Sequence, residues 1–149
     1  MKSWICGCWW RHRLGLLEAL LPGRLRYLPM AVMQAEAFAG WGVKRSGRLA
    51  RRAAHWRGLP ALTLEDGFVR SFGTGAYSPG LSLVVDDAGI YYDCTQPSAL
   101  EQLLASPVDV LAGPGSSAVQ ARAALLQAGL SKYNHAPDLP PDALRAGDA

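Results

Sequence analysis

The chain has 149 residues, half of them hydrophobic, which allows one compact core but hardly two domains. Its formal net charge of +3 hides a basic first part, because residues 1–60 hold eleven Lys and Arg against two carboxylates, whereas residues 61–149 hold four against ten. The arginines do not alternate with aromatics as in nucleic-acid-binding proteins, and the longest apolar run, residues 14–21, is shorter than the about 20 residues of a membrane span, so we expect neither nucleic acid nor a spanning helix.

Residues 1–35 form a poorly defined N-terminal segment in which apolar and basic residues mix. The start lacks the basic region, apolar core and cleavage site of a signal peptide, so we expect a cytoplasmic protein. Three cysteines, an odd number, agree better with a reducing compartment than with a disulfide framework. Cys6, Cys8 and His12 make a weak set of metal ligands, because a lone C-x-C has no second pair. We therefore predict no metal site.

The pattern sharpens at residue 36, where residues 37–42 predict a strand and a glycine-rich turn. Ser46 is the predicted N-cap of a helix over residues 47–57. The predicted packing face of this helix carries Leu49, Ala53 and Trp56, and the opposite face carries Arg48, Arg51, Arg52 and His55. Such a basic face is ordinarily solvated, and docking on an anionic partner is the alternative.

Residues 61–64 are apolar enough for an interior parallel strand, and charged residues gather directly after it. Ligands of α/β proteins bind at the carboxyl ends of strands, so Glu65 and Asp66 are candidate acid–base groups, and Arg70 can bind a carboxylate or phosphate. Neighbouring side chains on a strand point to opposite sides, so both carboxylates can face one substrate atom only if the chain turns, which Gly67 permits. A common Asp-Gly turn with a structural Glu65–Arg70 ion pair remains the alternative.

The loop over residues 71–80 is rich in glycine. Gly73 and Gly75 resemble the start of a phosphate-binding loop, but a third glycine and an adjoining helix are missing, so we interpret the loop as mobile, closely packed and open to a substrate. Residues 81–85 predict a strand that pairs with residues 90–93 in a hairpin. The acidic residues at its tip favour a turn over a divalent-cation site; they are Asp86 and Asp87, with Asp93 nearby.

Two helix starts carry the same signature. Ser98 and Glu101 form a capping box that opens a short helix, and Ser117 with Gln120 repeats the pattern for a helix that ends before Gly129. Residues 132–135 are rich in hydrogen-bond donors, and without further context we interpret them as structural. Residues 135–149 predict a Pro-rich disordered tail.

Six motifs, taken in their joint order and spacing, resemble the capsule polysaccharide biosynthesis family of β-Kdo glycosyltransferases. They cover residues 36–134 and are Trp41-Gly-x-Lys44, Leu64-Glu-Asp-Gly-Phe-x-Arg-Ser71, Leu81-Ser-Leu-Val-Val-Asp86, Gly89-Ile-Tyr-Tyr-Asp93, Pro97-Ser98-x-Leu-Glu101 and Lys132-Tyr-Asn134. The chain departs from the family at Gly73-Thr74-Gly75, where the family has Gly-Leu-Gly, and at Pro79-Gly80, where it has Pro-Pro.

This resemblance implies an α/β, Rossmann-like three-layer sandwich that is the incomplete first domain of a two-domain glycosyltransferase. It implies transfer of Kdo from CMP-Kdo, a donor substrate rather than a cofactor, onto a lipid-linked glycan at the cytoplasmic face of the inner membrane, with peripheral membrane contact. Family members continue beyond this length, so we expect a fragment without turnover of its own. The competing hypothesis is a non-catalytic binding module that docks on anionic lipid or another subunit.

Carried over by motif, the resemblance implies Glu65 and Asp66 as catalytic carboxylates. The implied substrate-binding residues are Gly67, Arg70, Ser71, Gly73, Gly75, Lys132 and Asn134. Kdo carries its own carboxylate, which Arg70 or Lys132 can bind, and an oxocarbenium-like transition state favours nearby carboxylates.

Overall fold

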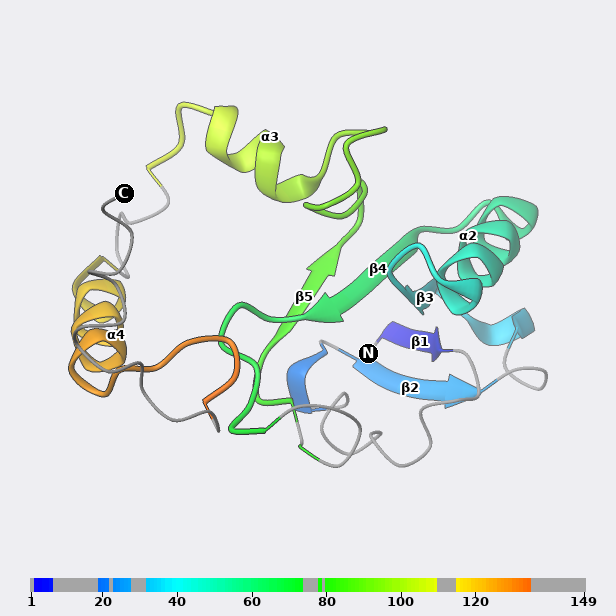
Figure 1. Cartoon of the computed structure of the whole chain (residues 1–149). Helices are drawn as coiled ribbons and strands as arrows, with labels where there is room; N and C mark the ends of the chain where they lie inside the picture. Colours follow the sequence, from blue (N-terminus) through cyan, green and yellow to red (C-terminus); the bar gives the residue numbers. More distant parts are fainter. Residues whose placement is uncertain are drawn as a thin grey trace, which may run out of the picture.

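The computed structural model describes residues 2–6, 19–21, 23–27, 32–73, 78, 80–109 and 115–134. In chain order the elements are β1 (Lys2–Cys6), β2 (Gly23–Tyr27), the 3-10 helix η2 (Val32–Gln34), β3 (Ala37–Trp41), α2 (Arg45–Arg57), β4 (Ala61–Asp66), β5 (Leu83–Asp86), α3 (Ala99–Ala105) and α4 (Gly115–Gln127) (Figure 1). Among these described helices none has the length and apolarity that crossing a membrane requires. The predicted tail, Gly75, Cys8 and His12 lie outside the described residues.

Five strands form one mixed sheet in the order β2-β1-β3-β4-β5. The first four are parallel, and β5 runs antiparallel to β4. The prediction of an α/β fold is confirmed. Two of the strands come from the N-terminal segment that the sequence pattern left undefined, and β1 lies between β2 and β3.

The predicted hairpin between β5 and residues 90–93 is wrong. β5 pairs with β4 instead, with Val85 opposite Leu64 and Leu83 opposite Asp66. Residues 91 and 92 form a turn, in which the backbone N–H of Asp93 donates to the carbonyl of Ile90 at 2.9 Å. β5 therefore pairs with the free edge of β4 rather than with residues 90–93, although these are closer to β5 in the sequence.

All five residues of β3 are buried, as expected of an interior strand covered on both faces. Phe38 packs with Ala50 and Ala54 of α2 on one face of the sheet. On the other face Trp41 and Leu64 belong to a second cluster, which Leu21 joins directly after the helical residues 19 and 20. The core thus has an apolar layer on each side of the sheet.

Small residues face the sheet from α2, so the predicted packing face is wrong for Leu49 and Trp56, whereas Ala53 packs against the core as predicted. The buried positions are Ser46, Gly47, Ala50 and Ala54, whereas Leu49 is 47% and Trp56 72% exposed. A Cβ atom on Gly47 would overlap the carbonyl oxygen of Gly42, and one on Gly40 would overlap that of Ser46. Helix and turn approach so closely here that only small residues fit, which rotates the large side chains toward solvent.

The helix ends follow local signals in three of five cases, one of which is Gly129, which lies just after the end of α4 with φ at 60°. Gly58 ends α2 with φ at 62°, and the capping box at the start of α3 is confirmed, with the Glu101 N–H 3.1 Å from Ser98 Oγ. Ser46 is not an N-cap, because α2 begins at Arg45 and the Ser46 hydroxyl accepts from the Trp41 N–H at 3.2 Å. Ser117 is not one either, because it lies inside α4.

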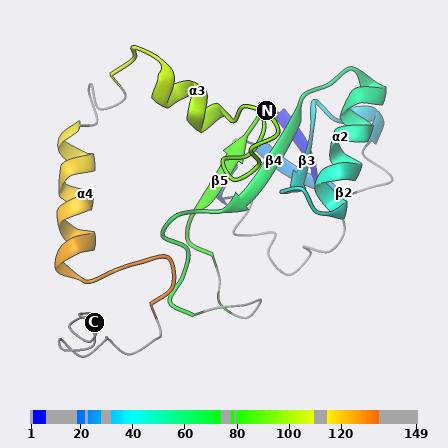
Figure 2. The ribbon, with the colours of Figure 1, turned by 45° about the horizontal axis from the view of Figure 1, so that its top comes forward.

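The helices α3 and α4 lie on the β5 side of the molecule, away from the sheet, whereas α2 packs against β3 and β4 (Figures 1 and 2). None of the residues of α3 is buried, and Leu104 on this helix is 73% exposed. Residues 131–134, which follow α4, return to the loop after β4. This return brings two distant parts of the chain together beside the exit of β4.

Candidate active site at the exit of β4

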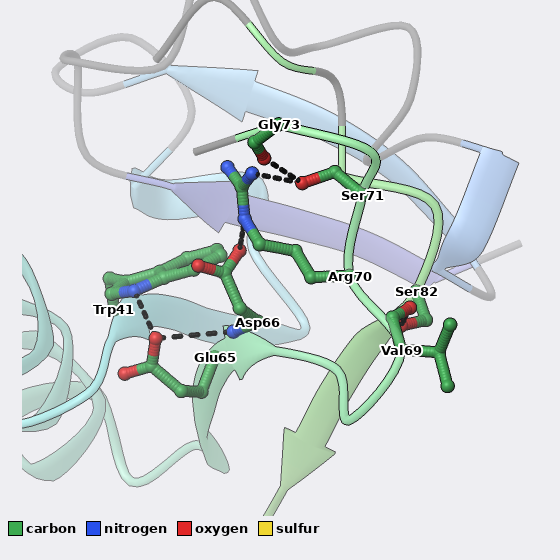
Figure 3. Close-up of polar contacts among 8 residues, drawn as sticks. All are labelled: Trp41, Glu65, Asp66, Val69, Arg70, Ser71, Gly73 and Ser82. Carbon is green, nitrogen blue, oxygen red and sulfur yellow. Dashed lines mark hydrogen bonds and ion pairs between the residues drawn. The ribbon is translucent and has the colours of Figure 1, made fainter. Parts of the chain in front are cut away.

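Gly67 directly follows the two carboxylates of β4 and extends the pairing with the β5 side by one residue, and the chain bends at Phe68 and Val69. The Gly67 N–H donates to the carbonyl of Ser82 at 3.1 Å, and a Cβ atom on Gly67 would overlap the Ser82 side chain. The Ser82 hydroxyl in turn donates to the carbonyl of Val69, shown in Figure 3. Gly67 is thus needed for the close approach of two backbone segments, whereas the turn predicted at this residue comes directly after it, at Phe68 and Val69.

Glu65 is surrounded by hydrogen-bond donors. Its Oε1 atom accepts from the indole Nε1 of Trp41 at 2.8 Å and from the backbone N–H of Asp66 at 3.1 Å (Figure 3). Its Oε2 atom accepts from the hydroxyl of Tyr92 at 2.9 Å. Both carboxylate oxygens therefore have partners, and the side chain is held from β3, from β4 and from the turn at residues 91 and 92.

Asp66 faces a different partner. Its Oδ1 atom lies 2.9 Å from Nε of Arg70, and the Asp66 side chain is 21% exposed, whereas that of Arg70 is 3% exposed (Figure 3). The Nη1 atom of Arg70 also donates to the Ser71 hydroxyl at 2.6 Å, which donates to the carbonyl of Gly73 at 2.6 Å. The ion pair considered from the sequence exists, but with Asp66 rather than Glu65, and it exposes the carboxylate more than the guanidinium.

The second predicted motif meets the first through its backbone. The carbonyl of Lys132 accepts from the N–H groups of Arg70 and Ser71 at 3.2 and 3.3 Å. The side-chain amide of Asn134 donates to the Ser71 carbonyl at 3.3 Å, and its backbone N–H donates to the Phe72 carbonyl at 2.8 Å. The structure brings the two motifs together as predicted, and in these contacts residues 132–134 hold the loop in place.

Three residues at the site belong to the motifs named in the sequence, but the sequence interpretation gave them no role. Trp41 and Tyr92 contact Glu65, and Tyr133 lies under Arg70, with 5.8 Å between the guanidinium carbon and the ring centroid. Trp41 could have been found, because it ends the parallel strand next to β4, and parallel strands end at the same edge. No local pattern in the sequence indicates that Tyr92 contacts Glu65, because the two residues lie on either side of β5 in the chain.

The other acidic residues are structural, as predicted for the turn. Asp86 is 2% exposed, and its Oδ1 atom accepts from the N–H groups of Ala88, Gly89 and Ala99 at 2.9, 2.7 and 3.1 Å. Asp93 accepts from the hydroxyl of Thr95 at 2.6 Å, and this bond lowers the pKa of Asp93. In the described residues, no group of three acidic, His or Cys side chains is arranged to hold a metal ion.

A surface pocket lies at the start of α3, away from the exit of β4. It is lined by Cys94, Thr95, Gln96, Pro97, Glu101, Gln102 and Ala105. None of the predicted site residues belongs to it, so it adds nothing to the carboxylate site.

Comparisons with known proteins give three findings. Residues 36–142 match the family of the capsule polysaccharide biosynthesis protein. The chain is 48% identical over 110 residues to the capsule polysaccharide modification protein LipA of Neisseria meningitidis serogroup B, covering 73% of this chain and 16% of LipA. It is 39% identical over 108 residues to the lipopolysaccharide-processing protein LpsZ of Rhizobium meliloti, covering 70% of this chain and 24% of LpsZ.

A solved structure is also similar. The structure of KpsC from Thermosulfurimonas dismutans, described as a beta Kdo 2,4 transferase, matches with a TM-score of 0.79 and 37% sequence identity. The match covers 95% of this chain and 44% of that one. The chain thus spans less than half the length of each of these relatives.

Proposed function

The chain belongs to the capsule polysaccharide biosynthesis protein family, and from this membership we propose that it forms the acceptor-side half of a glycosyltransferase. This enzyme would move Kdo from CMP-Kdo onto a lipid-linked glycan. The similarity to a beta Kdo 2,4 transferase supports Kdo as the transferred sugar. The observation that carries the proposal is the partly exposed carboxylate of Asp66, which Arg70 holds at the exit of β4.

Transfer of this kind needs a base. The hydroxyl oxygen of the acceptor bonds to the anomeric carbon of Kdo, the bond from that carbon to the phosphate oxygen of CMP breaks, and the hydroxyl proton must leave. A carboxylate within hydrogen-bond reach of the hydroxyl can take the proton, and its charge also favours an oxocarbenium-like transition state. We assign the role of base to Asp66.

Glu65 suits this role less well. Its two oxygens already accept from three donors, whereas the Asp66 carboxylate is paired with Arg70 through its Oδ1 atom. A proton acceptor must be reachable by the substrate hydroxyl, and Asp66 has the more open side. We therefore assign to Glu65 a supporting role and to Lys132, a half-buried residue whose carbonyl accepts from the Arg70 and Ser71 N–H groups, the binding of a sugar carboxylate.

The test is a transfer assay with a chimera in which residues 36–134 replace the matching segment of the Kdo 2,4 transferase. Asp66→Asn should lower kcat by about 10²–10⁴-fold with little change in KM, because the base is lost while the shape remains. Asp87→Asn is the matched control, since Asp87 is exposed at a turn, and it should leave turnover unchanged. Undiminished turnover of the Asp66→Asn chimera would contradict the assignment.

The alternative function, docking of the basic face of α2 on anionic lipid, has less support than the transferase, because two of its arginines bind backbone carbonyls. The guanidinium of Arg48 donates to the carbonyl of Val43, and that of Arg51 donates to the carbonyl of Gly42, each at 3.3 Å. These arginines help to close the turn between β3 and α2. Their structural use explains a basic face without an anionic partner.

A further inference from the structure

The two carboxylates at the end of β4 are linked through one peptide group. Glu65 Oε1 accepts from the backbone N–H of Asp66 at 3.1 Å, so the orientation of the Glu65 carboxylate is tied to the peptide that carries Asp66. The same peptide determines the direction in which the Asp66 side chain leaves the strand. Any group that holds Glu65 consequently also restricts Asp66.

Two aromatic side chains donate to Glu65, one from a residue before it in the sequence and one from a residue after it. Trp41 is 6% exposed in the core at the end of β3, and its indole N–H donates to Oε1 at 2.8 Å. Tyr92 belongs to the turn after β5, and its hydroxyl donates to Oε2 at 2.9 Å. A carboxylate with a donor on each oxygen cannot rotate without breaking a hydrogen bond.

The backbone leaves a space for the tyrosine hydroxyl. Gly42 has φ at +45°, and a Cβ atom there would overlap the Tyr92 hydroxyl and lie 2.9 Å from Glu65 Oε2. Glycine at this position therefore serves both the turn after β3 and the approach of Tyr92 to Glu65. The contact between Tyr92 and Glu65 therefore depends on glycine at position 42.

The hydroxyl of Tyr92 is a dependable donor. Burial and the neighbouring Glu65 carboxylate raise the pKa of Tyr92 to about 12. The hydroxyl consequently keeps its proton at neutral pH and can donate to Glu65 there.

We infer that Trp41 and Tyr92 are positioning residues, which act through Glu65 to keep the Asp66 carboxylate directed at Arg70. Both residues donate to the Glu65 carboxylate, and Glu65 Oε1 also accepts from the Asp66 N–H, so Glu65 carries their effect to the Asp66 peptide. The catalytic meaning of this arrangement rests on the proposed function, because Asp66 is the base only if the site transfers a sugar. The arrangement itself can be tested without any substrate.

The experiment is proton NMR of the whole 149-residue chain in which Tyr92→Phe is compared with Tyr91→Phe. Both variants lose one hydroxyl and keep the ring, but only the first loses a donor to Glu65. In Tyr92→Phe we expect the Nε proton of Arg70 to change its shift and to exchange with water about fivefold faster, the factor that one lost hydrogen bond gives. Tyr91→Phe should leave this signal unchanged.

Glu65→Ala provides a second route to the same answer, because it removes the acceptor through which Tyr92 would act. In that background Tyr92→Phe should add no further change to the Arg70 signal, since the two residues act in series. Additive changes, or an unchanged signal in Tyr92→Phe, would overturn the inference.

The transferase chimera separates this inference from the proposed function. Tyr92→Phe should lower kcat about fivefold with KM unchanged, as expected when the base is less well oriented. If the unmodified chimera transfers no Kdo, the proposed function fails, and the Arg70 signal of the 149-residue chain alone then supports or overturns the positioning role.

Discussion

Arg70 and Tyr133 lie against each other, with 5.8 Å between the guanidinium carbon and the ring centroid, although α3 and α4 both separate them in the sequence. This contact joins the motif after β4 to the motif after α4. A cation over an aromatic ring contributes about 0.5–2 kcal/mol, depending on how well it is shielded from water. Arg70 is thereby enclosed between Asp66 on one side and Tyr133 on the other.

Arg70→Ala should therefore lower the free energy of unfolding by about 2–3 kcal/mol. Breaking a buried ion pair costs about 3–5 kcal/mol, and the partial exposure of Asp66 reduces this figure. Urea unfolding of the purified chain measures the change. Arg52→Ala is the control, because Arg52 is exposed on α2, and it should change stability by less than about 0.5 kcal/mol. Equal stability of the two variants would show that the Arg70 pair contributes nothing.

Asp86→Asn should destabilise the chain by about 2–4 kcal/mol. The buried carboxylate accepts from the N–H groups of Ala88, Gly89 and Ala99, and hydrogen bonds to a charged acceptor contribute more than those to a neutral one. The measurement is again urea unfolding, with Asp87→Asn beside it as an exposed neighbour of the same type. A loss that is no larger in Asp86→Asn than in Asp87→Asn would contradict the structural role.

Gly47→Ala should lower stability by about 2 kcal/mol, although alanine is the better helix former by about 1 kcal/mol. The added Cβ atom would overlap the carbonyl oxygen of Gly42, which belongs to the backbone and cannot move aside easily. Thermal unfolding followed by circular dichroism tests this expectation. If Gly47→Ala raises the unfolding temperature, α2 does not approach the turn as closely as described.

Tyr92 should titrate far above an ordinary tyrosine. Its pKa is raised to about 12 in the folded chain, so the hydroxyl contributes stability that is fully present below pH 10 and is lost as the pH rises through about 12. The phenolate absorbance of the folded chain, minus that of Tyr92→Phe, isolates this group. A midpoint of the difference near 10 would mean that the hydrogen bond to Glu65 does not persist in solution.

Much of the exit of β4 was predictable because its signals are local. The run from Ala61 to Leu64, the charged pair that follows it and Gly67 are consecutive in the chain, and each acts within a few residues. The capping box at Ser98 is equally local, because a side chain and a backbone N–H three residues away satisfy each other. Such features depend little on the rest of the fold.

The packing of α2 was not predictable from apolar spacing. Leu49 and Trp56 lie on one face of the helix, but the sheet accepts the face with small residues because Gly40 and Gly47 allow the backbones to meet. Pattern recognition ranks side chains by apolar area and ignores the fit of two backbones. Apolar spacing likewise could not predict that β5 pairs with β4, because this pairing depends on the free edge of β4 in the folded sheet.

The roles of the carboxylates also depended on tertiary contacts. Neighbours in an extended strand face opposite sides, and this rule correctly separates Glu65 from Asp66. The partner that each would meet comes from elsewhere, Trp41 and Tyr92 for the first and Arg70 for the second. The alternative of a Glu65–Arg70 pair named the wrong acid because the bend at Phe68 and Val69 brings Arg70 back to Asp66.

The first strand of the chain has an unusual place, since β1 pairs with β2 on one side and with β3 on the other. Truncation at the amino terminus would thus not trim an edge but divide the sheet, leaving β2 without its neighbour among the described strands. An insertion or deletion before residue 7 changes an interior strand of the sheet, and we expect it to lower the stability of the chain as a core mutation does.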